Sequence, residues 1–451
     1  MKLVLRNIGH LVTVNGRREI LRDAYVASEE GWITAVGTGE CPPEFLANAE
    51  VVDAKGGIVT PGLINTHHHM FQNLARAFTP IANLPLYPWI QGHMPLWKNL
   101  SPEALYLAGK VAMTELMLTG CTATSDHHYV YPRGRGVSLE PLFRAAGELG
   151  IRLTACRGSM DQSSEIIPEN VTQTIDEIVA DSMAMVSQFH NRARGSMSQV
   201  ALAPTAVLSV TGDLLRETAR LAEANDLRMH IHCGETTGEL LRSDQLHQCR
   251  PLKYLERNGW NHDRIWLAHG IHFNDQEVRH LGDYRMGVAH CPCANMRLGS
   301  GVCRVNDLRA AGATVSLGVD GSASNDSGHL LGEVRQALML TRVAHGAGAM
   351  TVEQALELAT VEGARNLGRE KELGSVELGK CADLAVFPAY DLHSSGVENR
   401  VHGLVLCHPR RVDTLVVHGR VRVREGRVCG QELGQLLEQH DQAAKKLVQA
   451  A

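Results

Sequence analysis

The histidine triplet at residues 67–69 is the most informative chemical feature of the chain. It follows an apolar, β-branched run at residues 56–66 that contains Pro61-Gly62. In an extended strand, residues i and i+2 project to the same side, so His67 and His69 can bind one cation while His68 points away. Imidazole is the commonest nitrogen ligand of zinc. Because the chain has 23 histidines in 451 residues, about one His-x-His would arise by chance, and the motif gains meaning only if further ligands follow.

Three more apolar runs end in residues that bind metals or carry protons. The run before His232 continues to Glu235, another ends at His269, and a third ends at Asp320. If these runs are strands of one parallel barrel, their carboxyl ends meet where such barrels carry their active sites. The alternative is that these histidines are ordinary buried residues with structural hydrogen bonds. Four separate strand ends with metal-type ligands favour a metal site.

The middle of the chain alternates strand and helix patterns. A helix is predicted from the N-cap Ser101 and the first-turn Pro102 to about Leu118, ahead of Gly120. Eight strands separated mostly by helices predict an α/β fold, a (β/α)8 TIM-type barrel over residues 59–371. The expected strands are 58–67, 121–127, 152–157, 199–205, 228–232, 265–269, 286–290 and 314–320.

Short strands with turns occupy both ends of the chain. The turns include Asn15-Gly16 and Glu30-Gly31, as is typical of an antiparallel sheet. The two ends are predicted to build one small β-sandwich domain from residues 1–58 and 372–430, followed by a helical tail at 431–451. The expected strands are 2–7, 11–14, 23–28, 32–37, 381–387, 401–406, 412–417 and 420–424.

The composition is that of an ordinary globular protein. Apolar residues make up 44% and charged residues 21%, and the formal net charge is -5. Without a basic block, nucleic-acid binding is not expected to be the main role. No apolar stretch approaches the roughly 20 residues of a membrane helix, and the first residues do not resemble a secretory leader. The eleven scattered cysteines are expected to be reduced thiols, so the predicted location is the cytoplasm.

These motifs resemble those of the amidohydrolase superfamily, and in particular its aminohydrolase branch. The resemblance covers nearly the whole chain and is carried by residues 61–69, 230–236 and 373–384. It implies a metal site and a set of catalytic groups around it. The implied metal ligands are His67, His69, His232 and Asp320, and the implied catalytic residues are Glu235, His269 and Asp320.

The implied cofactor is one divalent metal ion, zinc in the first place, with iron or manganese as alternatives. Two-metal relatives use a carboxylated lysine at the end of strand four, and residues 200–205 contain no lysine. A bound metal lowers the pKa of a water and supplies hydroxide near neutral pH. Asp320 can accept the water's proton, Glu235 can pass a proton to the leaving amine, and His269 can orient the nucleophile. Cys291-Pro292-Cys293 lacks the cytidine-deaminase spacing and is interpreted as loop or core.

The candidate substrate-binding residues are Gln72, Trp89, Tyr129 and Arg157. The amide of Gln72 suits the N–H/C=O pair of a lactam, and Trp89 could cover a flat ring or simply pack under a loop. Tyr129 and Arg157 could contact substrate oxygens or brace loops. The combination resembles the branch that deaminates 8-oxoguanine, and it implies hydrolytic deamination of an oxidised purine to urate and ammonia. Deamination of guanine, isocytosine or a pterin, and hydrolysis of a triazine, are the alternatives.

The motifs imply no role for several residues of chemically active types. Residues near the expected barrel mouth that stay unassigned are His127, His128, Cys233, His272 and Asn325. The expected partner is a small heterocyclic substrate, with neither nucleic acid nor membrane. Relatives often assemble, so a homo-oligomer is also expected.

Overall fold

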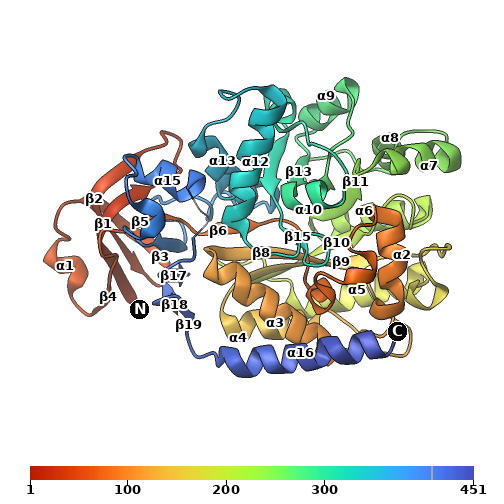
Figure 1. The fold of residues 1–451 in the computed structure, drawn as a ribbon, viewed down its shortest axis with the longest axis horizontal. Coiled ribbons are helices and arrows are strands. Elements are labelled where there is room, and N and C mark those ends of the chain that lie inside the picture. Colours follow the sequence, from red (N-terminus) through yellow and green to blue (C-terminus); the bar gives the residue numbers. More distant parts are fainter. Residues whose placement is uncertain (408–409) are drawn as a thin grey trace.

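A parallel eight-stranded barrel forms the centre of the molecule (Figure 1), as the sequence predicts. The computed structural model describes residues 1–407 and 410–451. Beyond the main strands, β7 (His68–His69) pairs in parallel with β15 (Asp320–Gly321) and joins the first and last strands at their carboxyl ends. The barrel strands, in spatial order, are β6 (Leu63–Asn65), β8 (Cys121–His128), β9 (Arg152–Ser159), β10 (Ser198–Pro204), β11 (Met229–Cys233), β12 (Ile265–His269), β13 (Gly287–His290) and β14 (Thr314–Leu317).

Helices surround the barrel, and the helix predicted to begin after Ser101 is one of them. In α3 (Pro102–Leu118) the Ser101 hydroxyl accepts the Ala104 amide, and the chain turns away at Gly120, where φ is +104°. The other elements between barrel strands are η1 (Met70–Ala75), η2 (Thr79–Ile81), α2 (Leu86–Trp97), α4 (Glu140–Leu149), η3 (Glu169–Val171), α5 (Ile175–Phe189), α6 (Gly212–Ala224), α7 (Thr237–His247), α8 (Pro251–Arg257), α9 (Asp275–Asp283), α10 (Pro292–Arg297) and α11 (Val305–Ala311). After the barrel come α12 (Leu330–His345), α13 (Val352–Leu358) and α14 (Val361–Asn366).

Strands from both termini join in one nine-stranded, mostly antiparallel sheet beside the barrel (Figure 1, red and blue). One apolar core unites Leu3 and Val26 from the N-terminal part with Leu384 and Val416 from the C-terminal part. The strands are β1 (Lys2–Val12), β2 (Ile20–Glu29), β3 (Trp32–Thr38), β4 (Ala49–Asp53), β5 (Ile58–Pro61), β16 (Leu384–Phe387), β17 (Thr414–Val417), β18 (Arg420–Arg424) and β19 (Arg427–Val428). Two short helical elements also belong to these terminal segments, α1 (Pro43–Leu46) before β4 and η4 (Leu392–Ser394) after β16.

The strand expected at residues 58–67 is two strands. β5 pairs with β1 and β16 in the terminal sheet, and only β6 enters the barrel. Gly62 separates them, with its amide donating to the Asp383 carbonyl at 2.8 Å. A Cβ at this position would lie 2.1 Å from Thr122 Oγ1, so only glycine lets the chain pass from one sheet to the other here.

The strand expected at residues 401–406 is wrong, because this segment is helix α15 (Arg400–Leu406). The Asn399 side chain accepts two amides of the first helical turn, a capping interaction that favours a helix start. Val401, Leu404 and Val405 are buried, and their spacing of three and four residues places them on one helical face. The apolar residues of this segment are compatible with a strand, but capping and packing decide for a helix.

A buried ion pair connects the barrel to the terminal sheet. Arg152, at the start of β9, donates from Nε to Asp383 Oδ2 at 2.8 Å and from Nη2 to Oδ1 at 3.1 Å. Both side chains are almost fully buried. Such bidentate pairs hold their partners in a fixed orientation, so this contact fixes the terminal sheet against the barrel's amino-terminal face.

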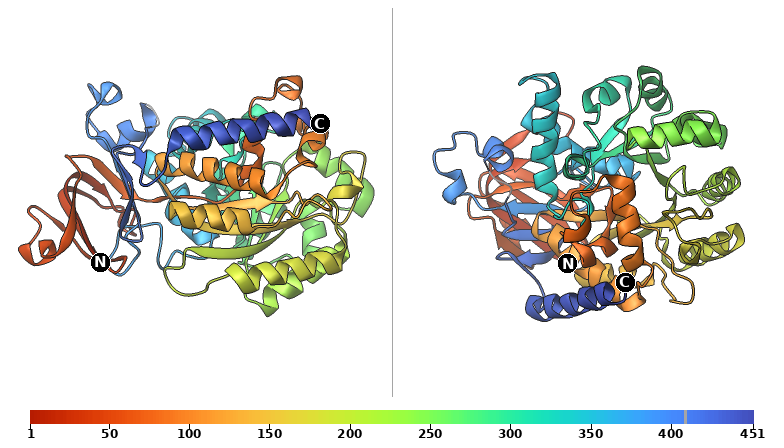
Figure 2. Two further views of the ribbon diagram at one scale, coloured as in Figure 1. Left: turned by 90° about the horizontal axis from the view of Figure 1, so that it is seen from below. Right: turned by 45° about the vertical axis from the view of Figure 1, so that its right-hand side comes forward.

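The chain ends in helix α16 (Leu433–Gln449), which lies within the segment predicted as a helical tail. The helix runs along α3 on the side of the barrel (Figure 2). Its His440 Nε2 lies 2.8 Å from Asn73 Oδ1 in η1. Within residues 1–407 and 410–451, none of the helices has both the length and the apolar character that a bilayer crossing requires.

Candidate metal centre and active site

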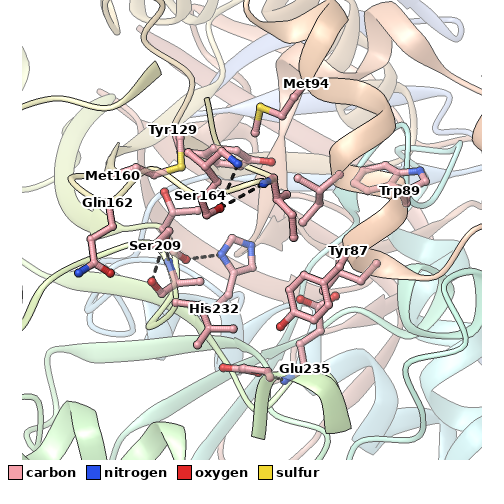
Figure 3. Close-up of a pocket in the computed structure, with 18 of the residues that line it drawn as sticks. Tyr87, Trp89, Met94, Tyr129, Met160, Gln162, Ser164, Ser209, His232 and Glu235 are labelled. Atoms are coloured by element: carbon pink, nitrogen blue, oxygen red, sulfur yellow. Dashed lines mark hydrogen bonds between the residues drawn. The ribbon is translucent and has the colours of Figure 1, made fainter. Parts of the chain in front are cut away.

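A cavity of about 760 Å³ opens at the carboxyl ends of the barrel strands (Figure 3). Figure 3 shows His232 between Tyr129 and Glu235, with Tyr87 and Trp89 on the side of α2. The cavity contains most of the predicted site residues. Those that line it are His69, Gln72, Trp89, Tyr129, His232, Glu235, His269 and Asp320.

Three imidazoles and one carboxylate converge at the base of this cavity. Asp320 Oδ1 lies 3.3 Å from His67 Nε2 and 3.4 Å from His69 Nε2. His69 Nε2 and His232 Nε2 are 3.1 Å apart. Donor atoms of His67, His69 and His232 all lie within 4.8 Å of one another. The four residues come from the first, fifth and last strand ends, and they are the set that the family resemblance implies as metal ligands.

The hydrogen bonds of the imidazoles determine which nitrogens carry protons. His69 Nδ1 lies 2.7 Å from the carbonyl oxygen of His127, and His232 Nδ1 lies 2.6 Å from that of Thr205. A carbonyl only accepts, so each Nδ1 carries the hydrogen and each Nε2 has a lone pair. Two lone pairs therefore face each other across 3.1 Å, an unfavourable arrangement unless a cation lies between them.

A relay of two hydrogen bonds, from His67 to His230 and from His230 to the Trp266 carbonyl, fixes the tautomer of His67. His230 Nδ1 donates to the Trp266 carbonyl at 2.7 Å, so its Nε2 accepts from His67 Nδ1 at 2.8 Å. His67 Nε2 is left as a buried acceptor with no hydrogen-bond partner in the described part of the chain. Burial also keeps the pKa values low, at about 3 for His232 and well below the usual range for His67. Neutral imidazoles with aimed lone pairs beside a carboxylate fit a divalent cation.

Glu235 and His269 flank this donor set. Glu235 Oε2 lies 3.7 Å from His269 Nε2, and His269 Nδ1 lies 2.9 Å from Asn295 Oδ1. Burial raises the pKa of Glu235 to about 7, against the opposing effect of His269. Glu235 can therefore take up and release a proton near neutral pH.

Two of the predicted catalytic residues have backbone conformations that residues other than glycine rarely adopt. φ is +73° at His269 and +61° at Asp320. Such conformations cost roughly 1–3 kcal/mol each and concentrate at functional sites. Both residues lie at strand ends and line the cavity.

The predicted substrate-binding residues divide into two groups. Gln72, Trp89 and Tyr129 line the cavity, and Gln72 Nε2 donates to the Tyr129 hydroxyl at 3.4 Å. Arg157 does not line it. Its guanidinium donates to Asp181 Oδ2 at 2.8 Å and to Gln173 Oε1 at 2.9 Å. This arrangement fits the alternative left open for Arg157, in which the side chain braces loops.

The unassigned residues have mainly structural contacts. His127 donates from Nε2 to the Ala203 carbonyl at 2.9 Å, and its own carbonyl orients His69. His272 Nε2 lies 2.8 Å from the Ser300 carbonyl, and Asn325 donates to the Val319 carbonyl at 2.6 Å. His128 is buried outside the cavity lining, and burial raises the pKa of the Cys233 thiol well above its usual range.

Three residues around the site were not found from the sequence. His230 orients His67, the Ser324 hydroxyl donates to Asp320 Oδ2 at 2.9 Å, and Glu239 Oε2 accepts the Glu235 amide at 2.8 Å. The second His-x-His at residues 230–232 was a usable signal for His230, because both imidazoles project to the same side of a strand. Ser324 and Glu239 could not be predicted from the sequence. Ser324 reaches Asp320 only through the turn after β15, and Glu239 reaches the Glu235 amide only from the first turn of α7.

The barrel, the donor set at its carboxyl ends and the sequence define a metal-dependent hydrolase, and the chain belongs to the amidohydrolase family, whose model matches residues 58–422. The chain is 43% identical to 8-oxoguanine deaminase of Pseudomonas aeruginosa over 424 residues, 93% of this chain and 94% of the relative. It is 31% identical to hydroxydechloroatrazine ethylaminohydrolase of a Pseudomonas species, over 97% of this chain and 94% of the relative.

Solved structures agree with this assignment. The zinc complex of atrazine chlorohydrolase from Arthrobacter aurescens superposes with a TM-score of 0.92 at 27% identity, covering 98% of this chain and all of the other. The predicted family, fold and hydrolase class are thus confirmed. This chain is an amidohydrolase of the kind that acts on carbon–nitrogen bonds.

Proposed function

We propose that this enzyme deaminates an oxidised purine, converting 8-oxoguanine and water to urate and ammonia. The observation that carries the proposal is the placement of Gln72 and Glu235 in one cavity with the donor set. The amide of Gln72 matches a lactam edge, and Glu235, 3.7 Å from His269 Nε2, would exchange protons with a substrate bound in this cavity. The 43% identity to an 8-oxoguanine deaminase supports this choice of substrate.

We propose His67, His69, His232 and Asp320 as the ligands of a single divalent metal, with zinc as the first choice. The zinc in a solved relative supports that choice. When bound, such an ion brings the pKa of a coordinated water close to neutrality. Asp320 then accepts a proton from the attacking water, and His269 orients that water toward the ring carbon that bears the amino group. Glu235 delivers a proton to the ring nitrogen, and Asp320 passes the proton that it accepted to the leaving amine as the carbon–nitrogen bond breaks. The hydroxyl proton left on the ring carbon then returns to Glu235.

Pterins and triazines are the alternatives that specific observations favour. The chain is 33% identical to an isoxanthopterin deaminase over 79% of its length, and the triazine enzymes superpose over almost the whole chain. The cavity of about 760 Å³ has room for either ring system. The same proton-transfer residues would serve all of them, so the choice depends on the groups that contact the ring edge.

The test is a substrate panel on the purified, metal-analysed enzyme. Ammonia release is measured with 8-oxoguanine, guanine, isocytosine, isoxanthopterin and a hydroxytriazine, and product identity is confirmed for any substrate that reacts. We expect 8-oxoguanine to give the highest kcat/KM, with urate as product. A higher kcat/KM for another ring system, or no turnover of 8-oxoguanine by enzyme with zinc restored, would contradict the proposal.

A further inference from the structure

Gly321, the residue after the proposed ligand Asp320, leaves space that the side-chain amide of Gln72 occupies. A Cβ built on Gly321 would lie 1.7 Å from Oε1, 2.3 Å from Cδ and 2.9 Å from Nε2 of Gln72. No other glycine in the described residues shows so close an approach. The backbone does not require glycine here, because Gly321 is not among the residues with positive φ. The absence of a side chain therefore serves the approach of Gln72.

The amide of Gln72 is enclosed from two sides. Gly321 lies on one side, at the end of β15, and the hydroxyl of Tyr129 lies on the other, 3.4 Å from Gln72 Nε2. The Gln72 side chain is buried, and its Oε1 has no hydrogen-bond partner among residues 1–407 and 410–451. Oε1 is the Gln72 atom nearest to the Cβ position of Gly321, so it lies in the space that this glycine leaves. Gln72 is thus held with its amide oxygen against Gly321 and its amide nitrogen toward the Tyr129 hydroxyl.

We propose that Gly321 is a specificity-determining residue, because its lack of a side chain makes the slot in which the Gln72 amide lies. Gly321 is covalently next to Asp320, so the slot fixes the distance between the amide and the donor set. That distance decides which ring edge can contact Gln72 while the amino-bearing carbon faces the attacking water. The inference rests on the proposed function and deepens it.

We expect the Gly321→Ala variant to fold. The atoms that a methyl group would meet are the far end of a flexible side chain, so Gln72 can rotate away without displacing the backbone. The new methyl group and the Gln72 amide cannot occupy their places together. The cost therefore falls on the position of the amide, and through it on substrate recognition.

A double-mutant cycle tests this coupling. The kcat/KM of wild type, G321A, Q72A and G321A/Q72A is measured with 8-oxoguanine, together with metal content and unfolding temperature. We expect G321A to lower kcat/KM by roughly tenfold or more with metal still bound. In the Q72A background the same change should alter kcat/KM within about twofold. Gly147→Ala is the matched control, since a Cβ at Gly147 in α4 meets no atom within 4 Å.

The proposal is overturned if G321A has wild-type kcat/KM, if its loss persists in full in the Q72A background, or if G321A loses metal. Failure of the proposed function is seen separately, in wild type, and the cycle is then run on whichever ring system the panel shows to react. A crystal structure of G321A gives a readout that needs no substrate. We expect a displaced Gln72 amide, and an amide that stays in place beside the new methyl group would also overturn the proposal.

Discussion

Removal of the His230 imidazole is predicted to weaken metal binding although His230 is not a proposed ligand. Its Nε2 accepts the Nδ1 hydrogen of His67 at 2.8 Å, and its own Nδ1 donates to the Trp266 carbonyl. In His230→Leu, the leucine fills most of the volume but accepts nothing. The Nδ1–H of fully buried His67 is then unpaired, and His67 is free to adopt the tautomer that turns its lone pair away from the metal.

The expected magnitude follows from the cost of a buried unsatisfied donor. That cost is about 1–3 kcal/mol, which corresponds to about a 5- to 150-fold weaker metal affinity. The same range is seen when groups that orient metal ligands are removed, about 10- to 100-fold. His230→Gln should lose less, because its amide oxygen can still accept from His67.

Competition with a chromophoric zinc chelator measures these affinities directly. The matched control is His93→Leu, since His93 is equally buried and donates to the Trp89 carbonyl at 3.0 Å, but takes no part in the donor set. We expect H93L to bind zinc like wild type. An unchanged zinc affinity in H230L, or an equal loss in H93L, would refute the relay from His230 to His67.

Two further predictions concern proton transfer and stability. Glu235→Gln keeps the size of the side chain but cannot move protons, so kcat should fall by about 10²- to 10⁴-fold while metal analysis shows full occupancy; retained turnover would exclude the shuttle. For the Arg152–Asp383 pair, burial acts to raise the pKa of Asp383, but Arg152 holds it below its ordinary value. The stabilisation is therefore present above the unfolded carboxyl pKa of about 3.9 and is lost as the pH falls through the folded value. Asp383→Asn should cost about 3–5 kcal/mol at pH 7, and the difference from wild type in denaturant unfolding should shrink below about pH 4. A pH-independent difference would contradict this explanation.

The sequence was most informative about residues at the carboxyl ends of the barrel strands. His67, His69, His232 and Asp320 could be placed together because the carboxyl ends of parallel barrel strands share one edge. The helical patterns with clear caps, such as the one that begins at Ser101, were also predictable from local chemistry.

The remaining features depend on contacts that form only in the folded chain. The guanidinium of Arg157 is occupied by Asp181 in α5 and by Gln173 just before that helix. The segment at residues 401–406 is a short apolar run that could form either a strand or a helix, and capping by Asn399 and burial of one helical face decide its structure. The value of Gly321 is likewise invisible in sequence, because Gln72 approaches it from a distant part of the chain. The oligomeric state stays a prediction.

We propose that one metal ion, held by His67, His69, His232 and Asp320, makes the chain a deaminase of 8-oxoguanine. The most direct test is a zinc titration of the metal-depleted protein, with ammonia release from 8-oxoguanine measured at each step. We expect activity to rise linearly and to saturate at one zinc per chain, with urate as the product. Full activity without metal, or saturation only at two ions per chain, would contradict the single-metal deaminase.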